Sequence, residues 1–258
     1  MRRREQMEHH IRRLCGRAIG DFGLIQNHDR ILVALSGGKD SWTLLHVLES
    51  LRRRAPVDFS LIAVTVHPGF PEFQTGLLEE HLRAHDFEYR IIPAPIHGLL
   101  LEKLAPDDTP CALCARIRRG VLYTQARELG CTKIALGHHR EDFIETLFMN
   151  QLYNGKIKAM APLLIADNGL DVVIRPLVYV PEDDIVRYAT SRGFPVSSCA
   201  CPGAGDPDMK RGRIKKLLAV LEQEQPGIKA SLLAALADVE HRHLLMKAGG
   251  EPRMTRDA

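Results

Sequence analysis

The amino-acid sequence predicts an α/β protein built on a doubly wound parallel sheet, flanked by N-terminal and C-terminal helices. Short, continuously apolar segments alternate along the chain with segments of helical periodicity. Two of the apolar segments lead directly into glycine-containing polar turns, at the strand ends where open α/β sheets bind their ligands. With 258 residues, of which 45% are hydrophobic, the chain is long enough to form one sizeable core.

The predicted elements follow one another in the order that such a sheet requires. Residues 5–20 place apolar side chains at helical spacing and predict an amphipathic helix before the first strand. Strands are predicted at 31–35, 61–66, 89–92, 133–137 and 172–174, with helices that begin near Trp42 and cover 76–85, 117–129 and 181–193. A loop rich in Cys, Pro and Gly over 197–208 leads into a basic helix. We therefore expect an N-terminal helical extension over 1–28, the main domain over 29–195, and a cysteine loop with a basic helical segment over 196–258.

Composition indicates a globular cytoplasmic protein. Charged residues make up 26% of the chain without a low-complexity tract, which argues against general disorder. No apolar run reaches transmembrane length, and the Arg-rich start leads into polar sequence rather than the apolar core of a signal peptide, so we expect no membrane association. The formal net charge of +3 does not distinguish a nucleic-acid-binding protein from an ordinary enzyme.

The first chemical motif, Ser36-Gly37-Gly38-Lys39-Asp40-Ser41, directly follows the predicted strand 31–35. A strand that feeds a glycine-rich turn into a helix exposes backbone N–H groups where phosphates can bind. The Walker pattern is absent because Lys39 is followed by Asp40, and the dinucleotide pattern G-x-G-x-x-G is missing too. The motif resembles the loop of the pyrophosphate-loop ATPases; the alternative is an ordinary strand-to-helix turn.

The second motif, Gly137-His138-His139-Arg140-Glu141-Asp142, ends another predicted strand and is expected to face the same crevice. A zinc or iron site is the alternative interpretation, but adjacent histidines on extended backbone point apart.

Four cysteines form a third pattern. Cys111 and Cys114 form a C-x-x-C before the predicted helix 117–129, and Cys199 and Cys201 lie far downstream. A structural zinc site, a redox C-x-x-C pair and an iron–sulfur cluster are all open interpretations. Cys15 and Cys131 stand in apolar surroundings, which is typical of buried, inert thiols.

The joint order of SGGKDS, PCALCARIRRG, TKIALGHHREDFIETLF, NGKIKAMAP, VIRPLVYV and a late cysteine resembles the tRNA 2-thiocytidine biosynthesis family, over roughly residues 8–240. The resemblance implies an adenine nucleotide alpha hydrolase-like, pyrophosphate-loop ATPase fold. It also implies ATP, Mg²⁺ and a 4Fe-4S cluster as cofactors. Members of the family adenylate the C2 oxygen of a cytidine in the tRNA anticodon loop and replace it with sulfur. One iron of the cluster stays open for hydrosulfide.

The resemblance also implies roles for individual residues. In the first motif, Ser36, Gly37, Gly38, Lys39 and Ser41 are expected to hold pyrophosphate, and Asp40 to organise Mg²⁺. Gly137 and His138 are expected near the nucleotide, Asp142 in catalysis, and Arg118 at a phosphate or at the adenylate. The expected cluster ligands are Cys111, Cys114 and Cys201, with Cys199 as the alternative third ligand. Two departures from the family pattern are Glu141, where Asp is usual, and a shortened stretch after Val66.

The expected partners are tRNA and a cysteine desulfurase or another sulfide donor, and a homodimer is compatible with the sequence. Three alternative functions are kept: a related enzyme that thiolates another base, an amidotransferase-like ligase, and a metal-stabilised RNA-binding module. The last would contact RNA through the basic residues of the late helix, Lys210, Arg211, Arg213, Lys215 and Lys216.

Overall fold

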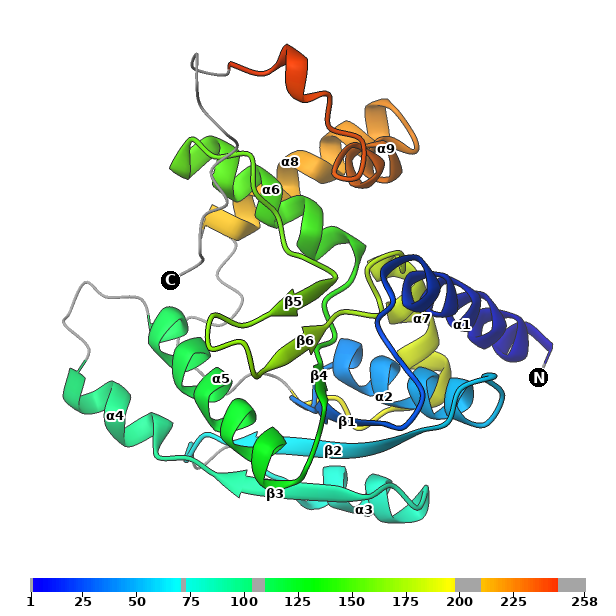
Figure 1. The fold of residues 1–258 in the computed structure, drawn as a ribbon, viewed down its shortest axis with the longest axis vertical. Helices are drawn as coiled ribbons and strands as arrows, with labels where there is room; N and C mark the ends of the chain where they lie inside the picture. The colour runs from blue at the N-terminus through cyan, green and yellow to red at the C-terminus, as the bar shows by residue number, and fades with distance from the viewer. Residues whose placement is uncertain (1, 71–72, 104–109, 198–209, 246–258) are drawn as a thin grey trace.

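A computed structural model of the chain describes residues 2–70, 73–103, 110–197 and 210–245 (Figure 1). Within these ranges, a six-stranded sheet has the order β3-β2-β1-β4-β6-β5. Every pairing is parallel except that of β5 with β6, so the predicted doubly wound α/β fold is confirmed. The strands are β1 (Asp29–Ala34), β2 (Phe59–His67), β3 (Tyr89–Pro93), β4 (Lys133–Ala135), β5 (Leu163–Ile165) and β6 (Val172–Ile174).

The chain reverses its direction across the sheet between β1 and β4. It runs from β1 outward to β2 and β3 and returns to β4 on the other side of β1. It then passes to β5 at the edge of the sheet and turns back to β6, which lies between β4 and β5. Ligands of open α/β sheets bind at such a switch point, beyond the carboxyl ends of the strands. Both sequence motifs leave the sheet there, one after β1 and one after β4.

Helices cover both faces of the sheet (Figure 1). α1, α2 and α7 pack against one another on one face, while α5 contacts β2 and β4 on the other. The described helices are α1 (Arg2–Phe22), α2 (Lys39–Arg52), α3 (Gly76–Ala84), α4 (Ile96–Lys103), α5 (Pro110–Glu128), α6 (Arg140–Asn154), α7 (Glu182–Arg192), α8 (Lys210–Glu224) and α9 (Ile228–Ala235), followed by the 3₁₀ turn η1 (His241–His243).

The central strand β1 supplies side chains to two hydrophobic clusters. Ile31 and Val33 belong to the cluster that α1, α2 and α7 cover, and Leu32 belongs to the one beneath α5. All three side chains are fully buried. Burial on both faces explains why this strand is a continuous apolar run rather than an alternating one.

The N-terminal helix α1 packs onto the sheet domain through Ile11, Cys15 and Ala18, which are fully buried. Burial raises the pKa of the Cys15 thiol, so this cysteine is the inert core residue that the sequence indicated. Cys131 is half-buried in the turn between α5 and β4. Burial raises the pKa of its thiol as well.

Several elements differ from the sequence prediction, which named neither α4 nor α6. α5 begins at Pro110 rather than at residue 117, so Cys111 and Cys114 lie inside its first turns and not before the helix. Proline is favoured at the first helical position, where its missing N–H has no intrahelical acceptor. β5, a three-residue strand at the edge of the sheet, was not predicted either.

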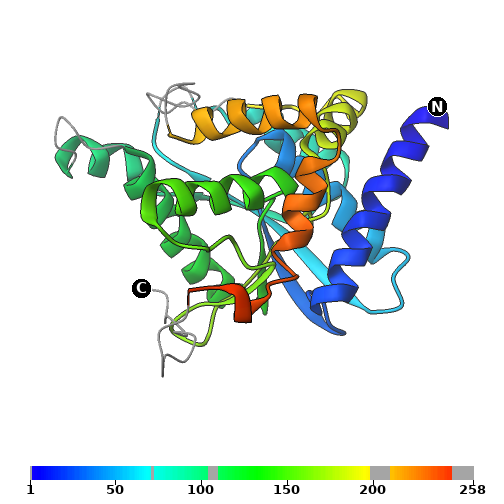
Figure 2. The same cartoon turned by 90° about the horizontal axis from the view of Figure 1, so that it is seen from above.

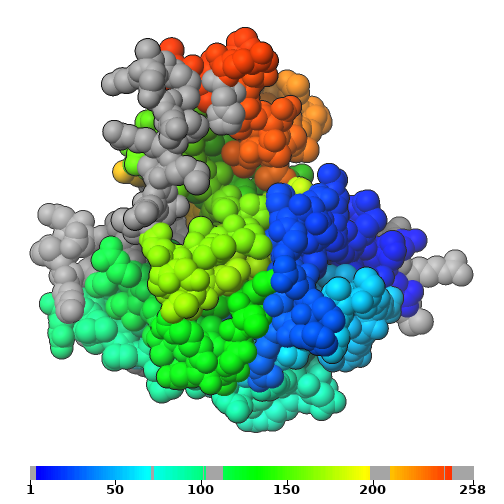
Figure 3. All heavy atoms as spheres, viewed as in Figure 1, coloured from blue at the N-terminus to red at the C-terminus, as the bar shows by residue number. Residues whose placement is uncertain are grey.

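α6, α8 and α9 form a separate helical layer beside the strand ends (Figure 2). Ile144 of α6 packs against Ile214 and Leu218 of α8. In the space-filling view of Figure 3, the yellow-green surface of the β5–β6 region lies beside the blue N-terminal segment and below the orange-red C-terminal segment. None of the described helices is both long and apolar enough to cross a membrane.

A buried ion pair at the amino ends of β1 and β4 generates a stability prediction. Asp29 accepts hydrogen bonds from Lys133 Nζ and from Thr132 Oγ1, each at 2.7 Å. Asp29→Ala would leave a buried ammonium without its partner, so we expect the free energy of unfolding to fall by about 3–5 kcal/mol in urea titrations. Glu88→Ala, which removes the exposed pair with Arg30 on the same strand, should cost less than about 1 kcal/mol.

The same pair has a pH dependence of defined sign. Burial by itself would raise the pKa of Asp29, but the bonds from Lys133, the Gln26 N–H and Thr132 lower it overall. A carboxyl with a lowered pKa stabilises the folded state at neutral pH, and this contribution disappears as the pH falls through its folded-state pKa. The difference between wild type and Asp29→Ala should therefore shrink in acid; a constant difference would contradict the ion-pair assignment.

Candidate functional site

Hydrogen bonds of Ser36 and Ser41 hold the loop between β1 and α2 in place. Ser41 Oγ donates to the Gly38 carbonyl at 2.9 Å and accepts from the Ser36 N–H at 3.2 Å. Gly37 has a φ of 84°, in the left-handed region, and a Cβ at this position would lie 2.2 Å from Ser197 Oγ. The first N–H groups of α2 have no intrahelical acceptors, so the loop and the helix start together form an anion-binding concavity.

Lys39 connects the loop to the start of α7. Its Nζ lies 3.0 Å from Asp40 Oδ1 and 3.2 Å from Glu182 Oε1, and Lys215 Nζ of α8 lies 2.7 Å from Glu182 Oε2. Burial by itself would lower the pKa of Lys39, but the two carboxylates raise it overall. Lys39 therefore stays charged at neutral pH. Glu182 could not be predicted from the sequence, because it is one of three acidic residues in the first turn of α7, where acidic side chains are common.

The second motif packs directly on the first, as its position after a strand predicted. A Cβ on Gly137 would lie 3.0 Å from the carbonyl carbon of Asp40 and 3.1 Å from the Ser41 nitrogen. Only glycine at this position allows the end of β4 to approach the start of α2 so closely.

His139 lies among three carboxylates and was not among the predicted site residues. Its Nδ1 lies 3.3 Å from Glu141, and its Nε2 lies 3.6 Å from Asp142 and 3.8 Å from Asp40. Burial by itself would lower its pKa, but these carboxylates raise it overall. His139 thus holds a proton more readily than a free histidine. The pair of histidines in the second motif could have indicated a role for His139, but the family resemblance implied a role for His138 only.

His138 faces a different partner from its neighbour, as extended backbone requires. Arg175 Nε donates to His138 Nδ1 at 3.2 Å. Burial, helped by the Arg175 cation, lowers the pKa of His138 to about 4, so the ring is neutral at pH 7. Because Nδ1 accepts a hydrogen bond, Nε2 carries the proton and can donate to a ligand.

Asp142 is held in place at the start of α6. Its Oδ2 accepts the His139 N–H at 3.0 Å, and its Oδ1 lies 3.7 Å from Arg211 of α8. Arg211 Nε lies 2.9 Å from Glu145, a buried carboxyl whose pKa burial raises. α8 therefore presents two basic side chains, Arg211 and Lys215, to the carboxylates of the site.

The cysteine region is described in part. Cys114 is buried with Val66, Phe70 and Ala94 in an apolar cluster, and the backbone of Cys111 lies in the first turn of α5. The side chain of Cys111 and the whole of Cys199 and Cys201 lie outside the described residues. One helical turn beyond Cys114, Arg118 has a buried Nε without a hydrogen-bond partner among the described residues.

The structure thus brings Ser36–Ser41, Gly137, His139 and Asp142 to one place at the switch point. The backbone N–H of Ser197 donates to the Gly37 carbonyl at 3.0 Å, so the segment that leads to Cys199 and Cys201 starts on the first motif. The zinc or iron alternative for His138 and His139 is not supported. Within the described residues, side chains with metal-ligand spacing come together at His46, His81 and His85 instead.

Comparisons with known proteins agree with this geometry. Residues 4–218 match the PP-loop domain family. The chain is 52% identical to a tRNA-cytidine(32) 2-sulfurtransferase of Geotalea uraniireducens, covering 91% of this chain and 93% of that one. It is 53% identical to a protein of the same name from Syntrophotalea carbinolica, covering 91% of each.

Solved structures show the same fold. The U34-tRNA thiolase NcsA from Methanococcus maripaludis with its 4Fe-4S cluster superimposes with a TM-score of 0.74 at 23% identity, over 91% of this chain and 79% of that one. An NH3-dependent NAD synthetase from Campylobacter jejuni has a TM-score of 0.50 at 15% identity, over 98% of each chain.

The contact at Gly137 generates a prediction for nucleotide binding. Gly137→Ala would push the start of α2 by a few tenths of an ångström, since its new methyl group meets backbone rather than a flexible side chain. Overpacking of this kind costs about 1–3 kcal/mol, so we expect ATP affinity to fall by about tenfold in calorimetric titrations. Gly20→Ala on α1, where the methyl group enters open space, should leave affinity unchanged. Equal affinities in both variants would refute the role of this contact.

Proposed function

The chain belongs to the PP-loop domain family, among relatives named tRNA-cytidine(32) 2-sulfurtransferase, and we propose on this premise that it uses ATP to replace the C2 oxygen of tRNA cytidine 32 with sulfur. The observation that carries the proposal is the packing of Gly137 onto Asp40 and Ser41, which joins both chemical motifs into one site. Identity above 50% over nine-tenths of the chain favours thiolation of cytidine over that of another base.

The loop of residues 36–41 fits the pyrophosphate end of ATP. Backbone N–H groups at the start of α2 and the positive end of its dipole would bind the β and γ phosphates. The charged Lys39 would neutralise the charge that develops on leaving pyrophosphate. Asp40, whose carboxylate is part-exposed beside Lys39, would hold Mg²⁺.

Adenylation of a cytidine carbonyl oxygen needs no proton removed from the attacking atom. The oxygen attacks the α-phosphorus, the bond to pyrophosphate breaks, and sulfide then replaces the activated oxygen as AMP leaves. The main task of the protein is therefore to orient the phosphates and to neutralise their negative charge, rather than to supply a strong base. In this proposal His138 Nε2–H and the Arg118 guanidinium donate to phosphate oxygens, and Asp142 positions His139 and Arg211.

The cysteine region suits an iron–sulfur cluster. Cys114 is buried beneath the first turns of α5, and the positive end of the helix dipole there favours thiolates over thiols. Cys111 and Cys114, with Cys201 or alternatively Cys199, would hold a 4Fe-4S cluster. When bound, the cluster would supply a position at one iron for the sulfur atom that is transferred.

The third cysteine is tethered to the nucleotide loop by the covalent chain. The Ser197 N–H is hydrogen-bonded to the Gly37 carbonyl, and Cys201 follows four residues later in the sequence. An extended chain spans at most about 3.6 Å per residue, which keeps either late cysteine within about 15 Å of the loop.

The amidotransferase-like alternative shares only the fold with this chain, as the NAD synthetase likeness at 15% identity illustrates. For RNA contact we propose Arg213, which is exposed on α8, rather than Arg211 and Lys215, which face carboxylates of the site. A cysteine desulfurase or another sulfide source, a second copy of the chain and a cytoplasmic location belong to the same proposal.

The function is tested with anaerobically purified protein, ATP, Mg²⁺, sulfide and a transcribed tRNA that carries cytidine 32. We expect AMP and 2-thiocytidine by nucleoside mass spectrometry, and no thiolation of a transcript with uridine at position 32. Asp142→Asn keeps an acceptor for the His139 N–H but loses the charge, so kcat should fall by about 100-fold or more while KM for ATP changes little. Thiolation of both transcripts, or an unchanged kcat, would refute the respective assignment.

Single cysteine substitutions separate the cluster from four-thiolate zinc. A cluster held by three cysteines should be lost in Cys111→Ser, Cys114→Ser and Cys201→Ser, together with thiolation, while Cys199→Ser keeps most of both. Cys131→Ser, at a half-buried cysteine outside this group, is the matched control and should retain cluster and activity. Iron, sulfide and zinc analyses with visible spectra provide the measurement. Stoichiometric zinc without iron would overturn the cluster assignment.

A further inference from the structure

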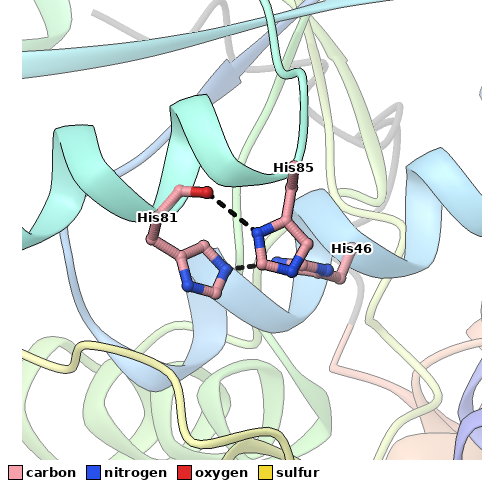
Figure 4. Close-up of side chains that lie close together, drawn as sticks. All are labelled: His46, His81 and His85. Atoms are coloured by element: carbon pink, nitrogen blue, oxygen red, sulfur yellow. Dashed lines mark hydrogen bonds between the residues drawn. The ribbon is translucent and has the colours of Figure 1, made fainter.

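Three histidines that belong to neither chemical motif gather between α2 and α3 (Figure 4). His46 comes from the middle of α2, and His81 and His85 come from the last turn of α3 and its carboxyl end. One ring nitrogen from each of the three lies within 4.8 Å of the other two. The His81 and His85 rings are stacked with centroids 4.2 Å apart, and His46 meets His85 edge-on at 5.1 Å.

We propose that His46, His81 and His85 form a binding site for a first-row divalent metal ion, with Zn²⁺ as the preferred occupant, which joins α2 to α3. Two histidines four residues apart on one helix and a third from a facing helix provide three nitrogen ligands on one side of an ion. Water would complete a tetrahedral shell, because the structure supplies no fourth ligand of this kind among its described residues.

The hydrogen bonds of His85 and His81 already direct lone pairs into the site. His85 Nδ1 lies 2.9 Å from the His81 carbonyl oxygen, which can only accept, so this nitrogen carries the proton and Nε2 carries the lone pair. A bond from the second ring nitrogen to a backbone carbonyl is the usual support of a metal-bound histidine. His81 Nε2 lies 2.9 Å from His46 Nε2 and accepts a hydrogen bond from it.

The assignment of that shared proton follows from Arg192. Its NH2 group lies 3.3 Å from His46 Nδ1 and can only donate, so Nδ1 accepts and Nε2 bears the proton. A metal ion bound at His46 Nε2 would take the place of this proton, and His46 would then carry its proton on Nδ1. Arg192 would have to turn away from Nδ1 toward Glu8, whose carboxylate lies 3.9 Å from the Arg192 guanidinium. Burial lowers the pKa of His46 to about 2 and that of His81 to about 4. Both rings are therefore neutral at pH 7, and an ion does not have to compete with a second proton on either ring.

The surroundings favour a defined site. Trp42 and Phe194 enclose the histidines with ring centroids 4.7 Å from His81 and from His46, respectively. Trp42 is fully buried, and it is the only tryptophan of the chain. Its fluorescence therefore responds to an ion bound at the histidine cluster.

Cobalt and zinc titrations of the full-length protein, purified anaerobically with its iron, test the proposal. We expect Co²⁺ to quench Trp42 fluorescence and to give visible d–d bands without a thiolate charge-transfer band, and Zn²⁺ to displace it at about one ion per chain. His81→Gln with His85→Gln should weaken binding by more than about tenfold. His243→Gln, at an exposed histidine of η1, is the matched control and should bind as wild type does.

Arg192→Gln provides a test that does not depend on removing a ligand. It takes away both a nearby cation and the donor that holds His46 in the wrong tautomer, so Co²⁺ should bind more tightly than in wild type. Absence of Co²⁺ binding by wild type, equal binding by the double histidine variant, or weaker binding by Arg192→Gln would each overturn the site.

Discussion

The contact of backbone with backbone at the carboxyl ends of β1 and β4 is the constraint on which the rest of the site depends. Gly137 brings the end of β4 against the first residues of α2, and Gly37 accepts the N–H of Ser197 on its other side. A side chain at either glycine would separate these segments. Because the loop is held from both sides, its N–H groups are oriented before a ligand arrives, which lowers the cost of binding phosphate.

A chain of alternating charges surrounds that contact. Carboxylates at strand ends would by themselves repel an anionic nucleotide, but each one here lies next to a basic group. Asp40 and Glu182 share Lys39, Asp142 faces His139 and Arg211, and Lys215 closes the series at Glu182. These pairs also connect α2, α6, α7 and α8, so the same interactions that balance charge hold the C-terminal helices over the strand ends.

Apart from His139, whose carboxylate partners include Glu141 and Asp142 of its own motif, the residues that the sequence did not predict act through partners on other elements. Arg175 lies in the VIRPLVYV segment, for which the sequence predicted no role, yet it sets the proton on His138, 37 residues away. Glu182 lies at a helix start, where acidic residues are common for dipole reasons alone. His46, His81 and His85 are unremarkable in sequence until α3 is placed against α2.

The sequence by itself determined five of the six described strands, most of the helices and the two motif loops, because each depends on the periodicity or turn chemistry of a few consecutive residues. The switch-point rule even predicted that the loops after residues 35 and 137 share a crevice. Only the tertiary structure decided that His139 rather than His138 meets Asp40, that α8 supplies Arg211 and Lys215 to the site, and that Ser197 is bonded to Gly37. Such contacts join residues separated by up to 160 positions in the chain. They follow from strand order and helix packing, which no local pattern encodes.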